Sequence, residues 1–509
     1  MSTTLPEKGA RRSTAALENG LKHDKPPQPA IPYKFIMIVL IGMTSISANG
    51  LTTSFTITQF HEYGNGSASD YYKLYDYEQS DDEHNGIGRN ITLLKRNFLS
   101  NAEKASLMMV VPIGAILSFF PVASCYKKFG FSRTFVFCLV LSSLTTAALP
   151  LVSNAQLFSL AIIVRIIQGI SFGAFLPVIA KVGSYLSIED FTMTTVLLFS
   201  YLQFSALLLF PLAGVLCWST LGWHSVHYIF AGWTMFITLV FIAYHYSEGF
   251  QRTVRQGRLF EIFYGTMAEH CSSSILTFHL PYLSIYQDLS FWGTMVGAFG
   301  YFTALQMSLQ YIPLFLNKVV SLSIITTGFL SALPRLLGFS ISVAAALKVI
   351  PLPQLGKDKL LRVRVYNSIS TVLPGLLCIS IAFFEPARQP TVVIVLYTLA
   401  SSFLGFAGGG FFSAIRYRSG AYSVFVVANV HAVCLVSHFF ISLLNALIAR
   451  NEEYNEWPSL FVAEGVMLIL CNVIFCLTVN TDKAEWTREG YEDTSYVPKR
   501  QDPMPQRPL

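Results

Sequence analysis

Residues 157–185 of the chain read LFSLAIIVRIIQGISFGAFLPVIAKVGSY, a run in which the charged side chains are Arg165 and Lys181. About 20 apolar helical residues span the hydrocarbon core of a bilayer, so this run is long enough to cross it. Roughly twelve such runs occupy the chain between Tyr33 and Val479 when it is scanned with a membrane-span window. The sequence therefore predicts an all-α integral membrane protein.

The composition agrees with this prediction. Hydrophobic residues make up 53% of the chain and charged residues 13%, and the mean hydropathy is +0.50. Soluble globular chains carry about 25% charged residues. The net charge of +6 could indicate a nucleic-acid partner, but the basic residues gather on one predicted side of the membrane. The expected partner is thus the lipid bilayer, with no nucleic acid.

The polar segment at 247–290 divides the chain, because it is the longest inside connection and leaves six runs on each side. This is the arrangement of two parallel repeats. The expected fold is twelve transmembrane helices in two six-helix halves. The first half, 33–246, has spans at 35–60, 105–125, 134–152, 157–185, 191–217 and 223–246. The second half, 291–480, has spans at 291–315, 325–349, 365–384, 392–412, 423–448 and 460–479.

Lysine and arginine are enriched in alternate connections, which by the positive-inside rule places both termini in the cytoplasm. The polar tails 1–32 and 481–509 are expected to be disordered. The long loop at 59–104 then lies outside and contains glycosylation sequons at Asn65 and Asn90. A glycoprotein of the plasma membrane or of an endolysosomal or vesicular membrane is expected.

The sequence contains no catalytic constellation. Its eight cysteines show neither a disulfide framework nor the paired spacing of a zinc site. No soluble region is large enough for a catalytic domain. We therefore expect no enzyme activity, no cofactor and no metal.

Residues 328–334 read GFLSALP, which closely resembles a signature of the organic anion and phosphate branch of the major facilitator superfamily. Sialin, the vesicular glutamate transporters and the type I sodium-phosphate cotransporters belong to this branch. Further matches follow in order at Arg165, Gly169, Gly173 and Pro177, at Pro211, Gly214, Gly222, Trp223 and 228–230, and at Trp457, Phe461 and Trp486. The resemblance covers 33–486 and implies a divergent solute carrier with the major facilitator fold, which we expect to be a monomer.

The chain departs from this family at charged positions. Phe172 stands where the family places a span-four glutamate, and Ser47 and Tyr301 align approximately with its arginines in spans one and seven. The resemblance therefore implies neither the substrate chemistry nor the coupling ion.

Two arginines remain near the midplane, Arg165 and Arg335, and an ionisable group there is a functional candidate because it costs at least a few kcal/mol. Guanidinium groups suit a carboxylate or phosphate, which they hold through two parallel bonds. Arg165 could instead bond carbonyls of a neighbouring span in a packing role. The polar residues that could orient the anion are Tyr301, Gln168 and Asn49.

Asn429 matches a family asparagine and is a further substrate-binding candidate, although asparagines also join helices by hydrogen bonds. His431 and His438 could supply the proton coupling that Phe172 cannot, with a satisfied core histidine as the alternative for each. Glu464 is a third coupling candidate, with a snorkelling or outer-cavity carboxylate as its alternative.

The sequence thus predicts a secondary transporter that moves a small organic or inorganic anion by alternating access, with H⁺ or Na⁺ as a possible coupling ion. The alternatives are a facilitator of a neutral solute and a transporter-derived protein that binds or regulates without transporting. A continuous polar path favours transport, whereas apolar side chains that plug the site favour the non-transporting protein.

Overall fold

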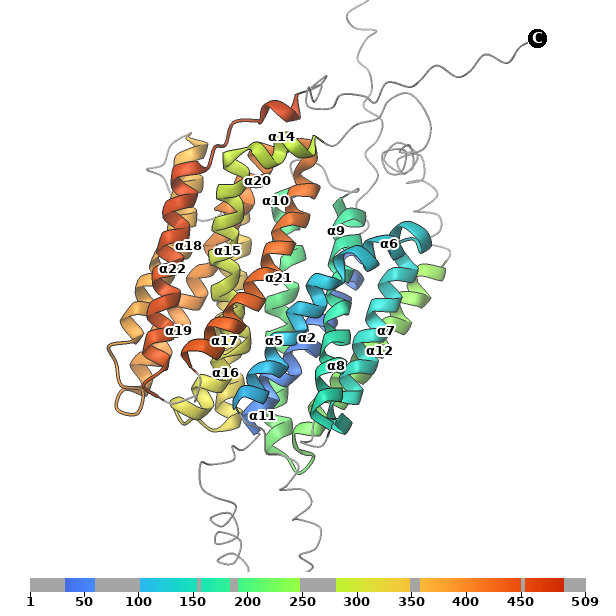
Figure 1. The fold of residues 1–509 in the computed structure, drawn as a ribbon, viewed down its shortest axis with the longest axis vertical. Helices are drawn as coiled ribbons and strands as arrows, with labels where there is room; N and C mark the ends of the chain where they lie inside the picture. Colours follow the sequence, from blue (N-terminus) through green and yellow to red (C-terminus); the bar gives the residue numbers. More distant parts are fainter. Residues whose placement is uncertain are drawn as a thin grey trace, which may run out of the picture.

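The computed structural model describes residues 33–59, 101–152, 157–183, 191–247, 281–347, 358–449 and 454–488. These residues form a bundle of long helices and contain no strand (Figure 1). The sequons at Asn65 and Asn90, the tail 1–32 and most of the connection 247–290 lie outside the described residues.

Six membrane-length spans precede residue 247. The second is bent by 44° between α5 and α6, and a 3-10 turn, η3 (Ser171–Ala174), interrupts the fourth. The helices are α2 (Tyr33–Thr56), α5 (Asn101–Leu117), α6 (Phe119–Phe129), α7 (Phe131–Val152), α8 (Phe158–Ile170), α9 (Phe175–Gly183), α10 (Phe191–Phe199), α11 (Tyr201–Trp218) and α12 (Gly222–Tyr246).

The second half begins with a short helix, α14 (Tyr282–Gln287), which precedes the seventh span. The tenth span is broken at η6 (Leu404–Gly408). The other helices are α15 (Leu289–Gln310), α16 (Ile312–Leu314), α17 (Ile324–Ala346), α18 (Lys359–Ile381), α19 (Pro390–Phe403), α20 (Phe411–Ser419), α21 (Ser423–Ile448) and α22 (Trp457–Thr478).

Nine helical segments of the described chain are long and apolar enough to cross a membrane, and the bent pair α5 and α6 makes a tenth. The other two spans, α15 and α18, are more polar. Protein surrounds α15 on almost every side, and α18 begins with Lys359, Arg362 and Arg364. The predicted fold class of twelve membrane helices is confirmed.

The two halves lie side by side and meet along two helix pairs. α11 packs along α17, and α5 packs along α21. One end of the bundle carries α14 and the ends of α6 and α20, and we call it the α14 face; the opposite end, which carries α16, is the α16 face (Figure 1).

Glycines of the family motifs lie at helix crossings. A Cβ atom on Gly328 of α17 would collide with the backbone carbonyl of Phe210 and come within 3.3 Å of the Cα atom of Gly214 on α11. Gly114 of α5 and Gly169 of α8 meet in the same way. Small residues let membrane helices approach closely, so the GFLSALP motif begins with a contact point between the halves.

Replacing Gly328 by valine is therefore expected to force α11 and α17 apart. Overpacking of a tight contact costs about 1–3 kcal/mol, and the measurement is the melting temperature of the purified protein in detergent. Gly232→Val on α12 is the matched control, because a Cβ atom there meets nothing within 4 Å. Equal melting temperatures for the two variants would contradict this account of the motif.

After the last span, residues 479–488 pack against the end of α20. The backbone N–H of Ala484 donates to the carbonyl of Arg418, whose guanidinium pairs with Asp288 at 2.8 Å and donates to the carbonyl of Asp482. Trp486 is buried against Tyr422. The expectation of disorder from residue 481 is therefore corrected for 481–488, because this segment buries an indole and bonds to the end of α20.

Candidate functional site

Arg335 lies in the middle of α17 and is 2% exposed. Its guanidinium donates to the hydroxyl of Tyr397 and faces that of Tyr301. Its Nε and Nη2 atoms are buried without a hydrogen-bond partner among the described residues. A buried donor that lacks a partner costs about 1–3 kcal/mol, and more when it is charged. This guanidinium thus has unused capacity to bind an acceptor.

Hydroxyl groups surround Arg335 on the side of the second half. The Tyr397 hydroxyl bonds to Ser308 and Ser401, whose Oγ atoms lie 3.0 Å apart. Gln203 of α11 reaches across from the first half to the Tyr301 hydroxyl, and its Oε1 atom has no partner in the described chain. We call Arg335, Tyr301, Tyr397, Ser308 and Ser401 the Arg335 cluster.

One face of α17 carries further polar groups toward the α16 face. Thr327 and Ser331 precede Arg335 at intervals of four residues, so all three share one side of the helix. Both hydroxyls are buried, and neither has a hydrogen-bond partner in the described part of the chain. Unsatisfied buried groups are rare in native proteins, and these form a polar row that ends at Arg335.

Arg165 on α8 is 1% exposed, but its guanidinium is occupied by the protein. Nε donates to the carbonyl of Leu107 on α5 at 3.0 Å, and Nη1 donates to the carbonyl of Gly50 on α2 at 3.1 Å and to Gln168 Oε1 at 2.6 Å. This is the geometry of the packing alternative, in which the side chain ties three spans of one half together.

Gln168 and Asn49 extend the same network. The Gln168 amide donates to the backbone carbonyl of Asn49 and to the Thr146 hydroxyl, while the Asn49 amide donates to the hydroxyls of Ser142 and Thr234. These bonds join α2, α7, α8 and α12. Arg165 bonds to α2, α5 and Gln168 of the first half, whereas Arg335 interacts with Tyr397 of the second half. The structure therefore places the two arginines in separate networks.

Asn429 lies near the α14 face rather than at the depth of Arg335. It sits two turns into α21, where its amide donates to the carbonyl of Phe425 and its Oδ1 accepts from the Tyr286 hydroxyl of α14. The contact ties α21 to α14.

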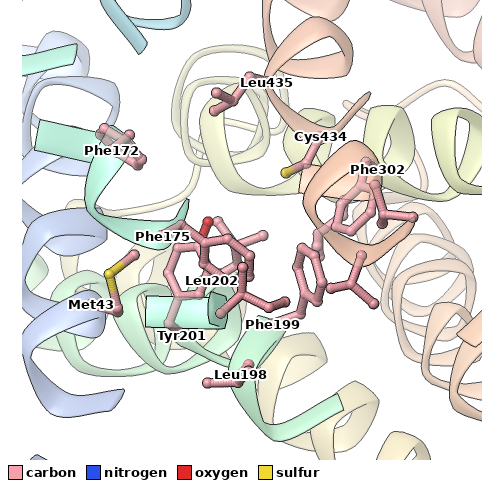
Figure 2. Packing of buried hydrophobic residues seen from close by; sticks show 14 of the residues in the cluster. Met43, Phe172, Phe175, Leu198, Phe199, Tyr201, Leu202, Phe302, Cys434 and Leu435 are labelled. Carbon is pink, nitrogen blue, oxygen red and sulfur yellow. The ribbon is translucent and has the colours of Figure 1, made fainter. Parts of the chain in front are cut away.

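His431 belongs to an aromatic layer between the halves. Its ring centroid lies 4.1 Å from that of Phe175 and 6.2 Å from that of Phe119, while Phe199 contacts Phe302 and Phe412. The backbone of Phe172 comes near, yet neither ring nitrogen makes a hydrogen bond within the described residues. We call these six residues (Phe119, Phe175, Phe199, Phe302, Phe412 and His431) the aromatic plug, part of which Figure 2 shows.

The other two coupling candidates lie elsewhere. His438 lies about two turns further along α21 than His431. It is buried, and Arg165 is its charged neighbour. Glu464 of α22 is 3% exposed and belongs to the second half, where Cys378 and Tyr397 are its electrostatic neighbours. The structure therefore does not place Glu464 on an exposed outer surface.

A small cavity lies beside the Arg335 cluster. This cavity of about 10 Å³ between Gln203, Tyr301 and Phe412 has room for about one water molecule. At the α16 face, Ile57 of the first span joins Ile312 and Leu314 of α16 in one apolar cluster. A separate cavity of about 200 Å³ opens there between α5, α16 and α21 and is lined by Lys104, Tyr311 and Asn445, among others.

Sequence reasoning missed several polar residues, among them Tyr397, Gln203 and His227. Tyr397 belongs to the Arg335 cluster, Gln203 reaches Tyr301 from the first half, and His227 of α12 bonds to Thr56 at 3.2 Å near Arg165. Each is a polar side chain inside an apolar run. That is a weaker signal than a charged side chain in such a run, which drew attention to Arg165 and Arg335. Their partners lie on other helices, so spacing along the sequence could not reveal them.

The comparisons with known proteins place the chain in a family. Residues 35–430 match the model of the Major Facilitator Superfamily. The chain is 22% identical over 396 residues to human "Sodium-dependent phosphate transport protein 1", covering 77% of the chain and 81% of that protein. It is also 22% identical to human "Probable small intestine urate exporter", over 72% of the chain and 74% of that protein.

A solved structure shows the same fold. The crystal structure of a D-xylose-proton symporter superposes with a TM-score of 0.61 at 14% identity, covering 89% of this chain and 99% of that one. The relatives are transporters of the branch that the span-eight signature predicts, which confirms the resemblance and the expectation that the chain is not an enzyme. The chain belongs to the major facilitator superfamily, and it is a multi-pass secondary transporter of the membrane.

Proposed function

We propose that this transporter carries a small organic or inorganic anion by alternating access, with Arg335 as the residue that binds it. The observation that carries the proposal is the buried guanidinium of Arg335, whose Nε and Nη2 atoms have no acceptor in the described chain. An anion that presents two oxygens would satisfy both atoms in the side-on fork geometry. Tyr301 and Gln203 would orient the anion from opposite halves.

If the protein transports, this structure would represent an occluded intermediate of the alternating-access cycle, because apolar side chains lie on both sides of the Arg335 site. The aromatic plug fills the space between the halves around His431, and the cluster of Ile57, Ile312 and Leu314 closes the α16 face. Separating α5 from α21, or α11 from α17, would open one approach at a time. In this proposal the unsatisfied row of Thr327 and Ser331 leads from Arg335 toward the α16 face.

A counterflow screen in proteoliposomes tests the function directly. Vesicles loaded with unlabelled phosphate, urate, sulfate or benzoate should accumulate the labelled form of the anion that the protein carries, at pH 6 and at pH 8. Protein-free vesicles and vesicles loaded with D-xylose are the controls. Accumulation of labelled D-xylose with none of the anions would support the neutral-solute alternative instead.

The aromatic plug favours a second candidate, a membrane protein that binds the anion without moving it. Five phenylalanines and His431 lie between the halves, and the imidazole has no hydrogen-bond partner among the described residues. Saturable anion binding to purified protein without counterflow, in the wild type and in Phe175→Ala, would support this candidate. Counterflow in the wild type excludes it.

We propose that the α14 face is cytoplasmic, which places both termini there. Lys127 and Lys128 end α6, and Arg416 and Arg418 end α20 at the same face. Basic residues near span ends favour the cytoplasm. Fluorescence localisation in cells would show whether the protein resides in the plasma membrane or in an endolysosomal or vesicular membrane.

Glycosylation tests this orientation. Treating the cell-expressed protein with an N-glycosidase should increase its gel mobility, because Asn65 and Asn90 then face the lumen or the exterior. The variant with both Asn65→Gln and Asn90→Gln should migrate like the treated protein and show no further shift. A glycosylation site engineered after Leu509 should remain unmodified. Its modification would contradict the proposed orientation.

A further inference from the structure

Glu464 is a carboxyl group buried inside the second half. It lies in the second turn of α22 and is 3% exposed. An ionisable side chain within a membrane span is costly and marks an ion or proton pathway by default. Protein buries this one, so it is not a carboxylate that reaches the headgroup layer.

The surroundings of Glu464 are tight and apolar. The neighbouring Gly465 meets Gly375 of α18 backbone to backbone, and a Cβ atom on Gly375 would lie 2.8 Å from the Gly465 carbonyl. Among titratable groups, Cys378 of α18 and Tyr397 of α19 face the carboxyl group. Tyr301 of α15 and His438 of α21 are not among its electrostatic neighbours. No described cation compensates a charge there.

Tyr397 connects Glu464 to the Arg335 cluster. Its hydroxyl accepts from Arg335, bonds to Ser308 and Ser401, and lies in the electrostatic field of Glu464. The one buried hydroxyl therefore interacts with a buried cation and with a buried carboxyl group of the same half. Binding at either end changes the electrostatic environment of the other.

We propose that Glu464 is the proton-binding site of this transporter and that Tyr397 links it to the anion on Arg335. The inference rests on the proposed function of Arg335 as the anion-binding residue. It places the coupling group in the second half, whereas Phe172 leaves the fourth span of the first half without a carboxyl group.

The linkage follows from charge. A proton from water on one side adds to a carboxylate oxygen of Glu464 to form an O–H bond, and it is released to water on the other side. The anion neutralises Arg335, and the proton removes the negative charge that would repel the anion. Coupling between two sites is reciprocal, so the bound proton raises anion affinity and the bound anion favours the proton.

A proton suits this site better than a sodium ion. Hard cations take several oxygen ligands, whereas Glu464 is flanked by Gly465, Gly375 and the Cys378 thiol. A carboxyl group takes up a proton without further ligands. Uptake should therefore follow a pH gradient and remain unchanged when choline replaces sodium.

The test measures binding and protonation separately on the purified full-length protein. Sulfate and benzoate are the anion probes, since both stay ionised between about pH 5 and pH 8. Infrared difference spectra report the carboxylic-acid C=O band of a protonated glutamate. In the wild type, anion affinity should rise about 5- to 150-fold between pH 8 and pH 5, the usual range of coupling, and anion addition should strengthen that band.

The Glu464→Gln variant should still bind the anion, but with an affinity independent of pH and without the infrared change. Tyr397→Phe should reduce the pH effect on anion affinity severalfold. The control is Glu385→Gln, which removes an exposed carboxylate paired with Arg388 and should behave as wild type.

The outcomes separate the two proposals. A Glu464→Gln protein that keeps the full pH effect overturns this inference and leaves the anion site standing, and loss of the effect in His431→Gln or His438→Gln would then move coupling to that histidine. A wild type that binds neither probe, nor phosphate nor urate, overturns the anion site and the linkage together.

Discussion

Replacing Arg335 by glutamine is expected to abolish anion binding while leaving the protein at least as stable as the wild type. Removing one partner of a buried charge pair costs about 2–5 kcal/mol, which is about 30- to 5,000-fold in affinity. The same guanidinium contributes little to folding, because Nε and Nη2 have no acceptor within the described chain. Burying an uncompensated charge opposes folding, so the melting temperature should rise or stay constant.

Binding of phosphate, urate, sulfate and benzoate to the purified variant, followed by thermal shift, measures both effects at once. The wild type should be stabilised by the anion it carries, and Arg335→Gln should not respond. Arg335→Lys keeps the charge but lacks the planar fork, so its affinity should fall between the two. An Arg335→Gln protein that binds the anion normally would exclude Arg335 from the site.

Arg165→Gln is expected to show the opposite behaviour, a large loss of stability. The wild-type side chain satisfies the backbone carbonyls of Leu107 and Gly50. A shorter amide cannot reach both, and each lost hydrogen bond to a charged group costs about 1.5–3 kcal/mol. We expect a loss of about 2–5 kcal/mol, seen as a low yield of folded protein and a depressed melting temperature.

The exposed Arg388 provides the matched control, because Arg388→Gln removes an arginine that pairs at the surface with Glu385. Its melting temperature should remain near that of the wild type. Fluorescence-detected size-exclusion chromatography of Arg335→Gln, Arg165→Gln and Arg388→Gln reports folding, and the anion-binding measurement on the same variants reports binding. If Arg165→Gln folded like the wild type and lost anion binding, Arg165 would hold the anion.

The number, order and approximate bounds of the spans could be predicted from the sequence. Hydrocarbon requires a fixed length of apolar helix, so runs such as 423–448 and 191–217 mark their own ends. The predicted 423–448 span coincides with α21 (Ser423–Ile448). Breaks within spans could not be predicted in this way, because η3 and η6 leave the hydropathy of their runs unchanged.

The candidate site was harder to predict. Sequence position could place Arg165 and Arg335 at membrane depth, but the roles of the two side chains depend on which acceptors lie across the helix interface. Arg165 finds carbonyls on α5 and α2, while Arg335 finds only the Tyr397 hydroxyl as a described acceptor. Such pairings depend on the rotation of each helix about its axis, which an apolar run leaves undetermined.

The burial of Arg335 and Glu464 in one half has an electrical consequence. Moving one elementary charge through a membrane potential is worth about 2.3 kcal/mol per 100 mV. With a monovalent anion on Arg335 and a proton on Glu464, this pair of sites carries no net charge, and with both ligands released the arginine and carboxylate again sum to zero. The membrane potential would then do no work on the reorientation of either the loaded or the empty carrier, and uptake would be electroneutral. In Glu464→Gln the empty carrier would be positively charged, so its return would depend on voltage.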